Sequence, residues 1–598
     1  MKLVNLKIRN FRGIRDLDWN IKGNMICLIG SGDSTKSTIL LALEYLFTPG
    51  WNLAVGESDF YQRKTDSPIE ISAIVTDLPK KFLDEDKFGL LLGFFYNSDN
   101  GTVSESQEDN SHPAIMITLT IKDDFEPVWE VISPKSLNYQ AEPRKINSQD
   151  RKLLGVARIG NYIDADLTWG RNSAISRLTS ELTNQTDQVP KLLADLERQI
   201  LLALRNPNLN VLSETIEAFK VNCQLLGIDS GEDLKAGIDP NRVSLRQGAI
   251  ALLDGNLPLT LRGAGTRRLM AMAAHKASVK EGAIILIDEI ENSLEPYRLR
   301  HLIRQLRPQE EQKHQVIFTT HSSVAIEECF ADELFVVRNE NGKIIIHHMD
   351  SNLQRVVRAA SECFLARKIV VCEGKTEEGF LIGIEQNYWQ PRRRQNKMKY
   401  QTLAESGITP VLGGGSSSPQ MAADLLSLGY EVVFFGDSDK INELKISPEE
   451  MQKLGIAVVL WEKDDITGEG LAIEQRLCLD LPIDALTELI NEAIKFKKLD
   501  DDISEERARM SVQDQLCEYA SGLFSRNSVF DFITSLDESN GLEFRKLLGK
   551  TAKEKGWFKR RDKGEKLGEL LSRYLDRMNN TPTEKTIKEL EVCCYDRI

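Results

Sequence analysis

Two groups of residues in this chain have the types and the spacing that chemistry on phosphates requires. The first group is a loop near the start of the chain that contains Gly30, Gly32, Thr35, Lys36, Ser37 and Thr38. The second group is a set of carboxylates in the last third of the chain, Glu373, Glu377, Asp437 and Asp439. A glycine-rich loop of this kind binds nucleotide phosphates, and clustered carboxylate oxygens suit Mg²⁺ or Mn²⁺. The pair predicts nucleotide control of a metal site that acts on phosphodiesters.

The loop has the local context that a phosphate-binding loop needs. An apolar run at 26–29 predicts a strand before it, and apolar residues at helical spacing after Lys36 predict a helix. In such a loop Lys36 reaches the β and γ oxygens of ATP, and Ser37 holds Mg²⁺. Thr35 stands where the GxxxxGK[ST] pattern has its second glycine, and its Cβ restricts the backbone beside the phosphates. We therefore expect nucleotide binding with slow turnover.

Two later apolar runs predict the other parts of an ATPase site. The run 284–287 leads to Asp288, which would orient Mg²⁺, and to Glu289, which would polarise the attacking water. The run 316–318 leads to His321, at the position of a γ-phosphate sensor. Between the loop and these runs, Gly263 and Gly265 open a predicted helix. This last segment is either a functional loop or an ordinary helix N-terminus.

The carboxylates follow two further apolar runs. The run 368–372 precedes Glu373 and Glu377, and the run 432–435 precedes Asp437 and Asp439. Parallel strands of an α/β fold bring their carboxyl ends to one edge of the sheet, where such folds build their sites. The alternative, a surface Asp-Ser-Asp turn, does not explain the Glu-Gly-Lys-Thr-Glu segment at this distance.

Composition limits the protein class. A chain of 598 residues with 41% hydrophobic and 28% charged residues predicts two or three globular domains. The first residues alternate like a strand rather than forming a signal peptide, and no apolar run approaches the about 20 residues of a membrane helix. Scattered cysteines without chelate spacing predict a reduced, cytoplasmic protein with no membrane partner.

The net charge of −14 excludes a basic coat for nucleic acid, yet two strips are basic. The strips are 388–400 and 553–566, and the second includes Trp557 and Phe558. Each strip is either a contact surface for a phosphate backbone or a solvated loop.

The first half resembles the ABC-type ATPase heads of the SMC/RecF/OLD group. The resemblance rests on Asn-Phe-Arg-Gly-Ile at 10–14 and on the segment 288–296, where Ile290 and Glu295 depart from the group's pattern. It implies that Gly263 and Gly265 act as a signature motif on ATP held by an opposite head, and hence a homodimer or higher homo-oligomer. It also implies a helical insertion at 175–235, whose leucine stripe serves dimerisation or packs on its own head.

The last third resembles the Toprim domain as it occurs in OLD-family nucleases. The resemblance implies that Glu373 is a metal ligand or general base and that Glu377, Asp437 and Asp439 are metal ligands. It also implies a second-metal acid, taken as Glu474 although other acids crowd residues 462–469, and a catalytic lysine. Lys563 is the first choice for that lysine, with Lys559 and Lys566 as alternatives.

These expectations combine into one reading of the chain. An α/β ATPase head occupies 1–174 and 236–360 around the insertion, and a Rossmann-like Toprim domain with added helices occupies 361–598. The predicted function is an ATP-regulated, Mg²⁺- or Mn²⁺-dependent DNA endonuclease of the OLD family in prokaryotic anti-phage defence, with the domain order of the Gabija nuclease subunit. Expected partners are DNA and an operon-encoded helicase-like subunit or a retron reverse transcriptase with its noncoding RNA.

Two other functions are alternatives to the nuclease. An ATP-switched DNA-binding scaffold with an inactive Toprim site is the main alternative. A topoisomerase or primase is disfavoured, because no domain around a strand-breaking tyrosine and no zinc ribbon can be recognised.

Overall fold

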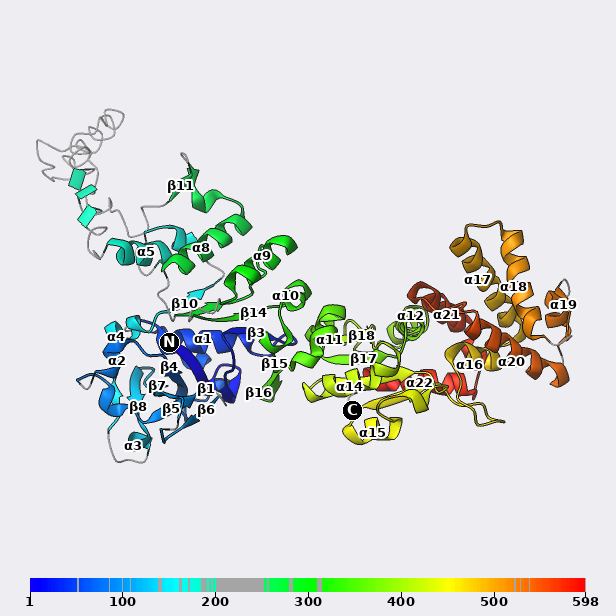
Figure 1. The fold of residues 1–598 in the computed structure, drawn as a ribbon, viewed down its shortest axis with the longest axis horizontal. Helices are drawn as coiled ribbons and strands as arrows, with labels where there is room; N and C mark the ends of the chain where they lie inside the picture. Colours follow the sequence, from blue (N-terminus) through cyan, green and yellow to red (C-terminus); the bar gives the residue numbers. More distant parts are fainter. Residues whose placement is uncertain are drawn as a thin grey trace, which may run out of the picture. The chain divides into compact units, whose positions relative to one another are not determined.

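The computed structural model describes residues 1–50, 53–84, 86–98, 101–107, 109–137, 142–160, 164–169, 173–183, 191–192, 195–196, 198–199, 252–254, 257–278, 283–308, 314–520, 523–526, 529–536 and 538–596. The chain forms two compact units (Figure 1). The first unit comprises Met1–Ile26 with Ser37–Thr319, and the second comprises Cys27–Lys36 with Thr320–Ile598. The predicted insertion at 175–235 lies largely outside the described residues. The predicted α/β class is confirmed.

The first unit contains an antiparallel sheet in the order β2-β1-β4-β7-β5-β6, with β8 beside β7 and β9 beside β8. Alternating side chains along β1 produce this arrangement, because Leu6 and Ile8 are buried between neighbours on both sides. The bounds are β1 Lys2–Phe11, β2 Ile14–Asn20, β4 Ile69–Thr76, β5 Phe94–Asn97, β6 Thr102–Ser104, β7 Ser111–Ile121, β8 Pro127–Ile132 and β9 Arg144–Lys145. Short helices α2 Lys80–Leu83, α3 Pro134–Leu137 and α4 Ser148–Leu153 connect these strands.

The first unit also contains parallel strands that are buried along their length. β10 Val156–Ile159 pairs with β13 Ile284–Ile287, and β13 pairs with β14 Gln315–Thr319. Continuous apolar runs are typical of parallel strands covered on both faces, so the strands predicted before Asp288 and before His321 are confirmed. The helices of this part are α1 Lys36–Phe47, α5 Ala174–Thr183, α8 Ala264–Ser278 and α9 Pro296–Leu306, and a small hairpin joins β11 Leu253–Asp254 to β12 Leu257–Pro258.

The second unit begins within the strand that leads into the phosphate loop, since residues 25–26 of this strand belong to the first unit and residues 27–29 to the second. β3 Met25–Ile29 pairs in parallel with β15 Leu334–Glu340, which forms an antiparallel hairpin with β16 Lys343–His348. Two short helices, α10 Ser323–Glu328 and α11 Gln354–Ala359, flank this hairpin in the sequence.

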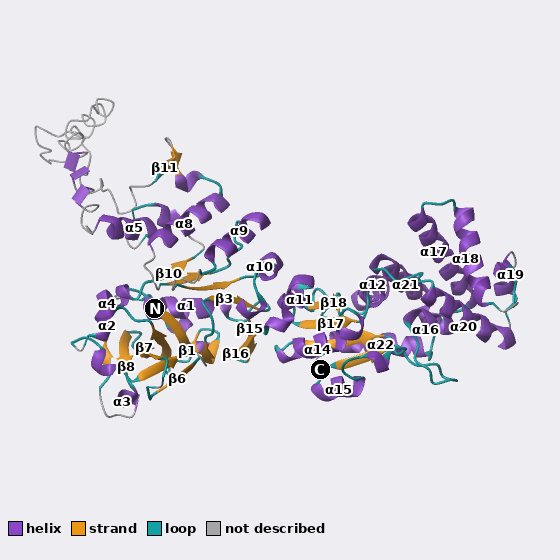
Figure 2. Cartoon of the chain, viewed as in Figure 1, coloured by secondary structure: helices purple, strands orange, loops and turns teal. Residues whose placement is uncertain are grey.

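A four-stranded parallel sheet, in the order β18-β17-β19-β20, forms the centre of the remaining part of the second unit. Its strands are β17 Lys368–Cys372, β18 Ile408–Leu412, β19 Glu431–Gly436 and β20 Ala457–Leu460. Helix α12 Lys375–Ile384 crosses from β17 to β18, and α14 Ser418–Ser427 crosses back to β19 (Figure 2). Because right-handed crossovers in opposite directions use opposite faces, both faces of the sheet are covered.

One hydrophobic core joins this sheet to the C-terminal helices. Helix α21 (Arg561–Tyr574) packs so closely on α12 that a Cβ at Gly379 would lie 2.0 Å from the Arg561 carbonyl oxygen. Only glycine permits this approach, which fixes the helix that carries Glu377. The other helices are α13 Gln390–Gln395, α15 Pro448–Leu454, α16 Ile473–Asp480, α17 Ile483–Asp501, α18 Glu505–Tyr519, α19 Val529–Thr534, α20 Glu538–Glu554, α21 Arg561–Tyr574 and α22 Pro582–Tyr595.

A search of the described helices for one long and apolar enough to cross a bilayer found none.

Candidate functional site

The phosphate loop is closed around the amine of Lys36. Its Nζ donates hydrogen bonds of 3.0 Å to the carbonyl oxygens of Gly30 and Ser31 and to Ser34 Oγ. Gly30 has φ +138°, and a Cβ there would lie 2.7 Å from the Val337 carbonyl oxygen. The loop therefore needs glycine at its first position, and it holds Lys36 at the start of α1, where backbone N–H groups point toward an anion.

Thr35 adopts the backbone conformation of the glycine that it replaces. Its φ is +69°, in the left-handed region that β-branched residues avoid. Such a conformation costs about 1–3 kcal/mol for a residue other than glycine. The loop thus keeps the geometry of the pattern and stores strain at this position.

Replacing Thr35 with glycine is expected to stabilise the protein by about 1 kcal/mol, because the relief of strain exceeds the extra entropy of the unfolded chain. Chemical denaturation measures the change, and equilibrium dialysis measures ATP affinity, which we expect to rise. The matched control is Thr38→Gly within α1, which should destabilise by about 1 kcal/mol. Equal effects of both changes would contradict the strain at Thr35.

The carboxylate of Asp288 accepts three hydrogen bonds. Ser37 Oγ and Thr319 Oγ1 each donate to Asp288 Oδ1 at 2.8 Å, and Arg158 donates to Oδ2 at 3.2 Å. Arg158 also pairs with Glu44 on α1. The structure therefore brings the two predicted Mg²⁺ residues, Ser37 and Asp288, into direct contact.

Glu289 sits in a strained turn directly after β13. Its φ is +47°, and its N–H donates to Thr319 Oγ1 at 2.8 Å. The buried Arg268 on α8 donates to the carbonyl oxygens of Asp288 at 2.8 Å and Glu289 at 2.7 Å. Burial lowers the pKa of the Arg268 guanidinium. Sequence reasoning missed Arg268, although it lies in the glycine-rich segment that was singled out.

The two glycines of that segment differ in environment. Gly263 is exposed just before α8, whereas a Cβ at Gly265 would lie 2.4 Å from the Ser293 carbonyl oxygen. The segment is thus docked on the turn that follows Glu289. His321 is exposed two residues after the end of β14, at the predicted place in the sequence.

The carboxylates of the second unit come from the ends of β17 and β19 and from the starts of α12 and α16. Glu373 Oε2 accepts a hydrogen bond of 3.0 Å from the Asp437 N–H. Asp437 Oδ1 in turn accepts one of 2.9 Å from the Ile473 N–H, directly before Glu474. Glu377 lies one turn into α12 and is buried. Backbone N–H groups therefore connect Glu373 to Asp437, and Asp437 to the residue before Glu474.

These acids raise one another's pKa values. Burial raises the pKa of Glu377 to about 8, and the charges of Glu474 and Glu373 add to the shift. Burial, followed by Glu377, Glu474, Glu373 and Asp439, holds the pKa of Asp437 well above its usual range. Burial also raises the pKa values of Glu373 and Glu474. The surroundings therefore disfavour the ionised forms of these four carboxyls.

Lysines on the second basic strip face this group. Lys553 Nζ lies 2.6 Å from Asp439 Oδ2 and 3.1 Å from Gln475 Oε1. The positive charges of Lys559 and Lys553 lower the pKa of Glu474 and so oppose part of the increase that burial causes. The predicted Lys563 instead pairs with Asp500 at 2.6 Å. Lys553 is a site residue that sequence reasoning missed, because only the pairing of α20 with α16 brings it to Asp439.

The two basic strips are not simple solvated loops. In the second strip Trp557 and Phe558 belong to the hydrophobic core. In the first, Arg393 pairs with Glu591 at 3.0 Å, and Arg392 pairs with Asp576. Much of the positive charge of both strips is therefore matched by acids of the same unit.

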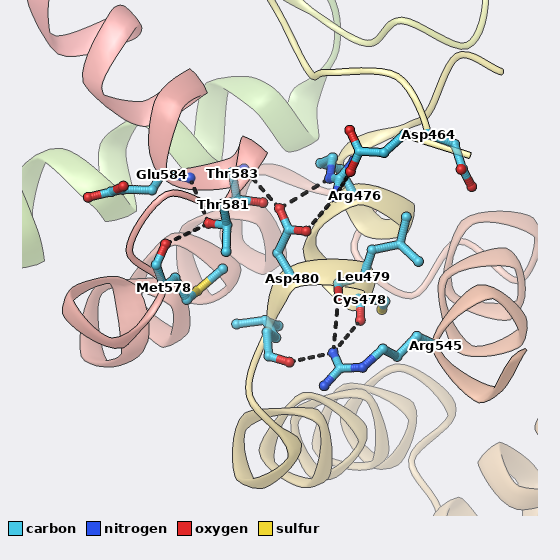
Figure 3. A network of polar contacts seen from close by, with 12 residues as sticks. Asp464, Arg476, Cys478, Leu479, Asp480, Arg545, Met578, Thr581, Thr583 and Glu584 are labelled. Carbon is cyan, nitrogen blue, oxygen red and sulfur yellow. Dashed lines mark hydrogen bonds and ion pairs between the residues drawn. The ribbon is translucent and has the colours of Figure 1, made fainter. Parts of the chain in front are cut away.

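A network of arginines holds the helix that carries Glu474 (Figure 3). Arg476 donates to both carboxylate oxygens of Asp480, and Arg545 donates to the carbonyl oxygens at the end of α16, including Cys478 at 2.9 Å. Asp480 also accepts a hydrogen bond of 2.8 Å from the Thr583 N–H at the start of α22. These contacts fix both the position and the rotation of α16.

The acids fit a divalent cation by their chemistry. Buried carboxylates with raised pKa values and hard oxygen donors are suited to Mg²⁺ or Mn²⁺, whose charge would relieve their repulsion. In the described part of the chain, however, no three or more His, Cys, Asp or Glu side chains are already grouped tightly enough to hold an ion. Binding an ion at these acids would therefore require their side chains to converge.

In the presence of a chelator, the unfolding free energy of the second unit is expected to fall as pH rises from about 4.5 to about 8. The folded protein keeps the Glu377 proton up to a pKa of about 8, whereas the unfolded chain loses it near 4.5. The folded state then binds more protons over this window, so raising pH destabilises it. Denaturation at several pH values should show a flatter profile for Glu377→Gln, while Glu378→Gln keeps the wild-type slope. Parallel profiles for wild type and Glu377→Gln would contradict the buried acid.

Comparisons with known proteins give two family matches, both within residues 1–327. Residues 1–156 match the family described as "AAA ATPase domain", and residues 204–327 match "AAA domain, putative AbiEii toxin, Type IV TA system". No curated protein matches the chain.

The solved structures that match are distant. An SMC head bound to the C-winged helix domain of ScpA is 15% identical, covering 58% of this chain and 98% of its own, with a TM-score of 0.32. The SMC head domain from Thermotoga maritima is 13% identical, covering 58% and 100%, with a TM-score of 0.27. The RecF–ATP structure is 11% identical, covering 58% and 99%, with a TM-score of 0.32. The family matches indicate ATPase domains in the N-terminal part of the chain and support ATP binding.

Proposed function

We propose that the chain is an ATP-regulated, divalent-metal-dependent DNA endonuclease. The observation that carries the proposal is the group of buried acids, Glu373, Glu377, Asp437, Asp439 and Glu474, whose pKa values are raised by burial and mutual repulsion at four of the five. Buried charge of one sign is costly, so a chain keeps it where a cation and a reaction use it. We assign this role to a Toprim-like domain at 361–598.

Each residue has a role that follows from its contacts. Divalent ions, when bound by these acids, supply an activated water and stabilise the leaving oxygen of a phosphodiester. Glu373, whose pKa is raised by burial, is suited to accept the proton of that water. Lys553 brings a positive charge to Asp439, and it would stabilise negative charge on a phosphate held at these acids. Lys563 stays a candidate for the same task.

The ATPase residues supply the regulation. Lys36, Ser37 and Asp288 would hold Mg²⁺-ATP, Glu289 would polarise water and His321 would sense the γ-phosphate. The strain at Thr35 favours a site that binds ATP more than it hydrolyses it. Gly263 and Gly265 would contact ATP on a second copy, so the working form is a homodimer or larger. We place this activity in anti-phage defence, with an operon-encoded partner.

A DNA-binding scaffold is the second candidate. The contact that favours it is the ion pair between Lys553 and Asp439, which neutralises one acid of the group without a metal. A scaffold would bind DNA in response to ATP and would not need the proton acceptor at Glu373.

Replacing Glu373 with alanine separates the two candidates. For a nuclease, DNA cleavage should fall by about 100-fold or more, because even changes in the outer shell of a metal site cost about 10–100-fold. Plasmid nicking and DNA binding are measured on the same preparations. The control is Glu449→Ala on the exposed side of α15, which should leave both unchanged. Undiminished cleavage by Glu373→Ala would refute the assignment of this residue.

A further inference from the structure

A single strand connects the phosphate loop to a half-buried arginine, Arg338. β15 pairs with β3 in register, with Phe335 opposite Leu28 and Val336 opposite Ile29. The next residue of β15, Val337, has its carbonyl oxygen where a Cβ at Gly30 would come within 2.7 Å. Displacement of the loop at Gly30 is therefore opposed directly by β15, with no side chain between them to absorb it.

Arg338 follows Val337 and stacks on Tyr430. The guanidinium carbon of Arg338 lies 3.7 Å from the centroid of the Tyr430 ring. Tyr430 is buried, and its hydroxyl donates a hydrogen bond of 2.7 Å to the Phe364 carbonyl oxygen. Because Tyr430 directly precedes β19, this contact lies at one end of the strand whose other end leads to Asp437.

The turn before β19 packs on the same hairpin. Gly429 has φ +77°, and a Cβ there would lie 3.1 Å from His347 Nε2 and 3.3 Å from Arg338 Cγ. His347 lies on β16 opposite Val336. The backbone of Gly429 therefore packs against the side chains of His347 and Arg338 on the hairpin β15–β16, and a residue larger than glycine at 429 would crowd them.

The stacked arginine is not satisfied in this arrangement. Nε and Nη2 of Arg338 are buried and have no hydrogen-bond acceptor among the described residues. Burial also lowers the pKa of this guanidinium. Unmet buried donors are costly, so a rearrangement that gives these two nitrogens an acceptor is favoured over leaving them unmet. A contact that can adopt two arrangements is what coupling between two sites requires.

We propose that the contact between Arg338 and Tyr430 transmits nucleotide occupancy of the phosphate loop to the acids at the end of β19. ATP at residues 30–37 displaces Gly30 against Val337, β15 shifts the guanidinium on the Tyr430 ring, and β19 moves Asp437 relative to Glu373. This inference concerns the regulation of the carboxylate site and rests on the function proposed for it.

Hydrogen exchange on the full-length wild-type protein tests the coupling without any nuclease activity. Peptides that cover 429–437 are followed without nucleotide, with ATP and with a non-hydrolysable ATP analogue, and binding is measured separately with a fluorescent nucleotide. We expect protection of this segment to change by about fivefold or more when nucleotide binds, the lower range of measured couplings. Bound nucleotide with unchanged exchange at 429–437 would overturn the proposal.

Substitutions at the contact provide the second arm. Arg338→Met keeps the length of the side chain and removes the charge and the unmet donors, so the fold should persist. In this variant the exchange response at 429–437 and the ratio of nicking rates with and without ATP should both fall to about one, while nucleotide affinity is retained. Tyr430→Phe keeps the ring and should keep the response, whereas Tyr430→Leu should lose it.

The matched control removes a stacked arginine elsewhere in the same unit. Arg393 lies 3.6 Å from the centroid of the Tyr595 ring, away from β15. Arg393→Met should leave the response to ATP unchanged. A wild-type response in Arg338→Met and Tyr430→Leu would overturn the proposal. Absence of nicking in every protein, with the exchange response intact, would instead refute the nuclease function and leave the coupling supported.

Discussion

Replacing Asp437 with asparagine is expected to abolish DNA cleavage and at the same time to make the protein more stable. Asparagine keeps the oxygen that accepts the hydrogen bond from the Ile473 N–H, so the loop after β19 is preserved. It removes a carboxyl group whose pKa is raised by burial and then by the charge of Glu377. Without a metal, holding this carboxyl in a buried acidic group destabilises the fold, so its replacement should raise the melting temperature in a chelator by about 2–4 °C.

The two effects of Asp437→Asn have opposite signs, which makes the experiment discriminating. Cleavage should fall by more than about 100-fold, because a ligand is worth more than an outer-shell residue. Scanning calorimetry in EDTA and plasmid nicking in Mg²⁺ are the measurements. Asp424→Asn on α14, where the carboxylate accepts a hydrogen bond from Gln420 on the same helix, is the control and should change neither. A variant that is destabilised and still cleaves DNA would show that Asp437 is a structural residue.

Replacing Lys36 with alanine is expected to weaken ATP binding and, at a fixed ATP concentration, to reduce the effect of ATP on cleavage. The amine is held inside the loop by Gly30, Ser31 and Ser34, so it is already positioned for the phosphates. Hydrogen bonds to a charged group contribute about 1.5–3 kcal/mol, so affinity should fall by about 10-fold to 100-fold. Equilibrium dialysis with labelled ATP measures the change.

The cleavage activity of Lys36→Ala in the absence of ATP provides a separate result. It should equal that of wild type, because the hydrogen bonds of the Lys36 amine to Gly30, Ser31 and Ser34 lie within the phosphate loop. Lys7→Ala, which breaks an exposed pair with Asp18 on neighbouring strands, is the control for removal of a lysine. Normal ATP affinity in Lys36→Ala would mean that the loop is not the nucleotide site.

The elements around the phosphate loop were predictable because their signals are local. The apolar run before Gly30 became β3, and the helix expected after Lys36 became α1. The conflict at Thr35 was also visible, because the pattern requires glycine where the sequence has a β-branched residue. Its outcome, a threonine held at φ +69°, required the structure. Local sequence indicates the strain, and the surrounding contacts decide whether the chain accepts it.

For the carboxylate group, the sequence predicted the strands and the acids that directly follow them, but not every acid of the group. The run 368–372 became β17, and the run 432–435 became most of β19. Glu474 could be chosen among several neighbouring acids only by resemblance. In the structure it is buried at the start of α16, next to the N–H that binds Asp437, whereas Asp464 pairs with Lys546 at 2.8 Å.

Lys553, Arg268 and Arg338 could not have been found from the sequence. Each acts through a partner that is distant in the chain: Asp439, the backbone after β13 and the ring of Tyr430. No periodicity or spacing reports such contacts, because they arise when whole helices and strands pack. A lysine on α20 becomes a site residue only because α20 lies against α16.

Plasmid nicking by the purified full-length protein tests the central claim most directly. Supercoiled DNA is incubated with the protein in Mg²⁺ or in Mn²⁺, each with and without ATP, and in a chelator. We expect open-circular or linear DNA with metal, none in the chelator and a rate that depends on ATP. Intact plasmid under every one of these conditions, with and without the operon-encoded partner, would contradict a metal-dependent nuclease regulated by ATP.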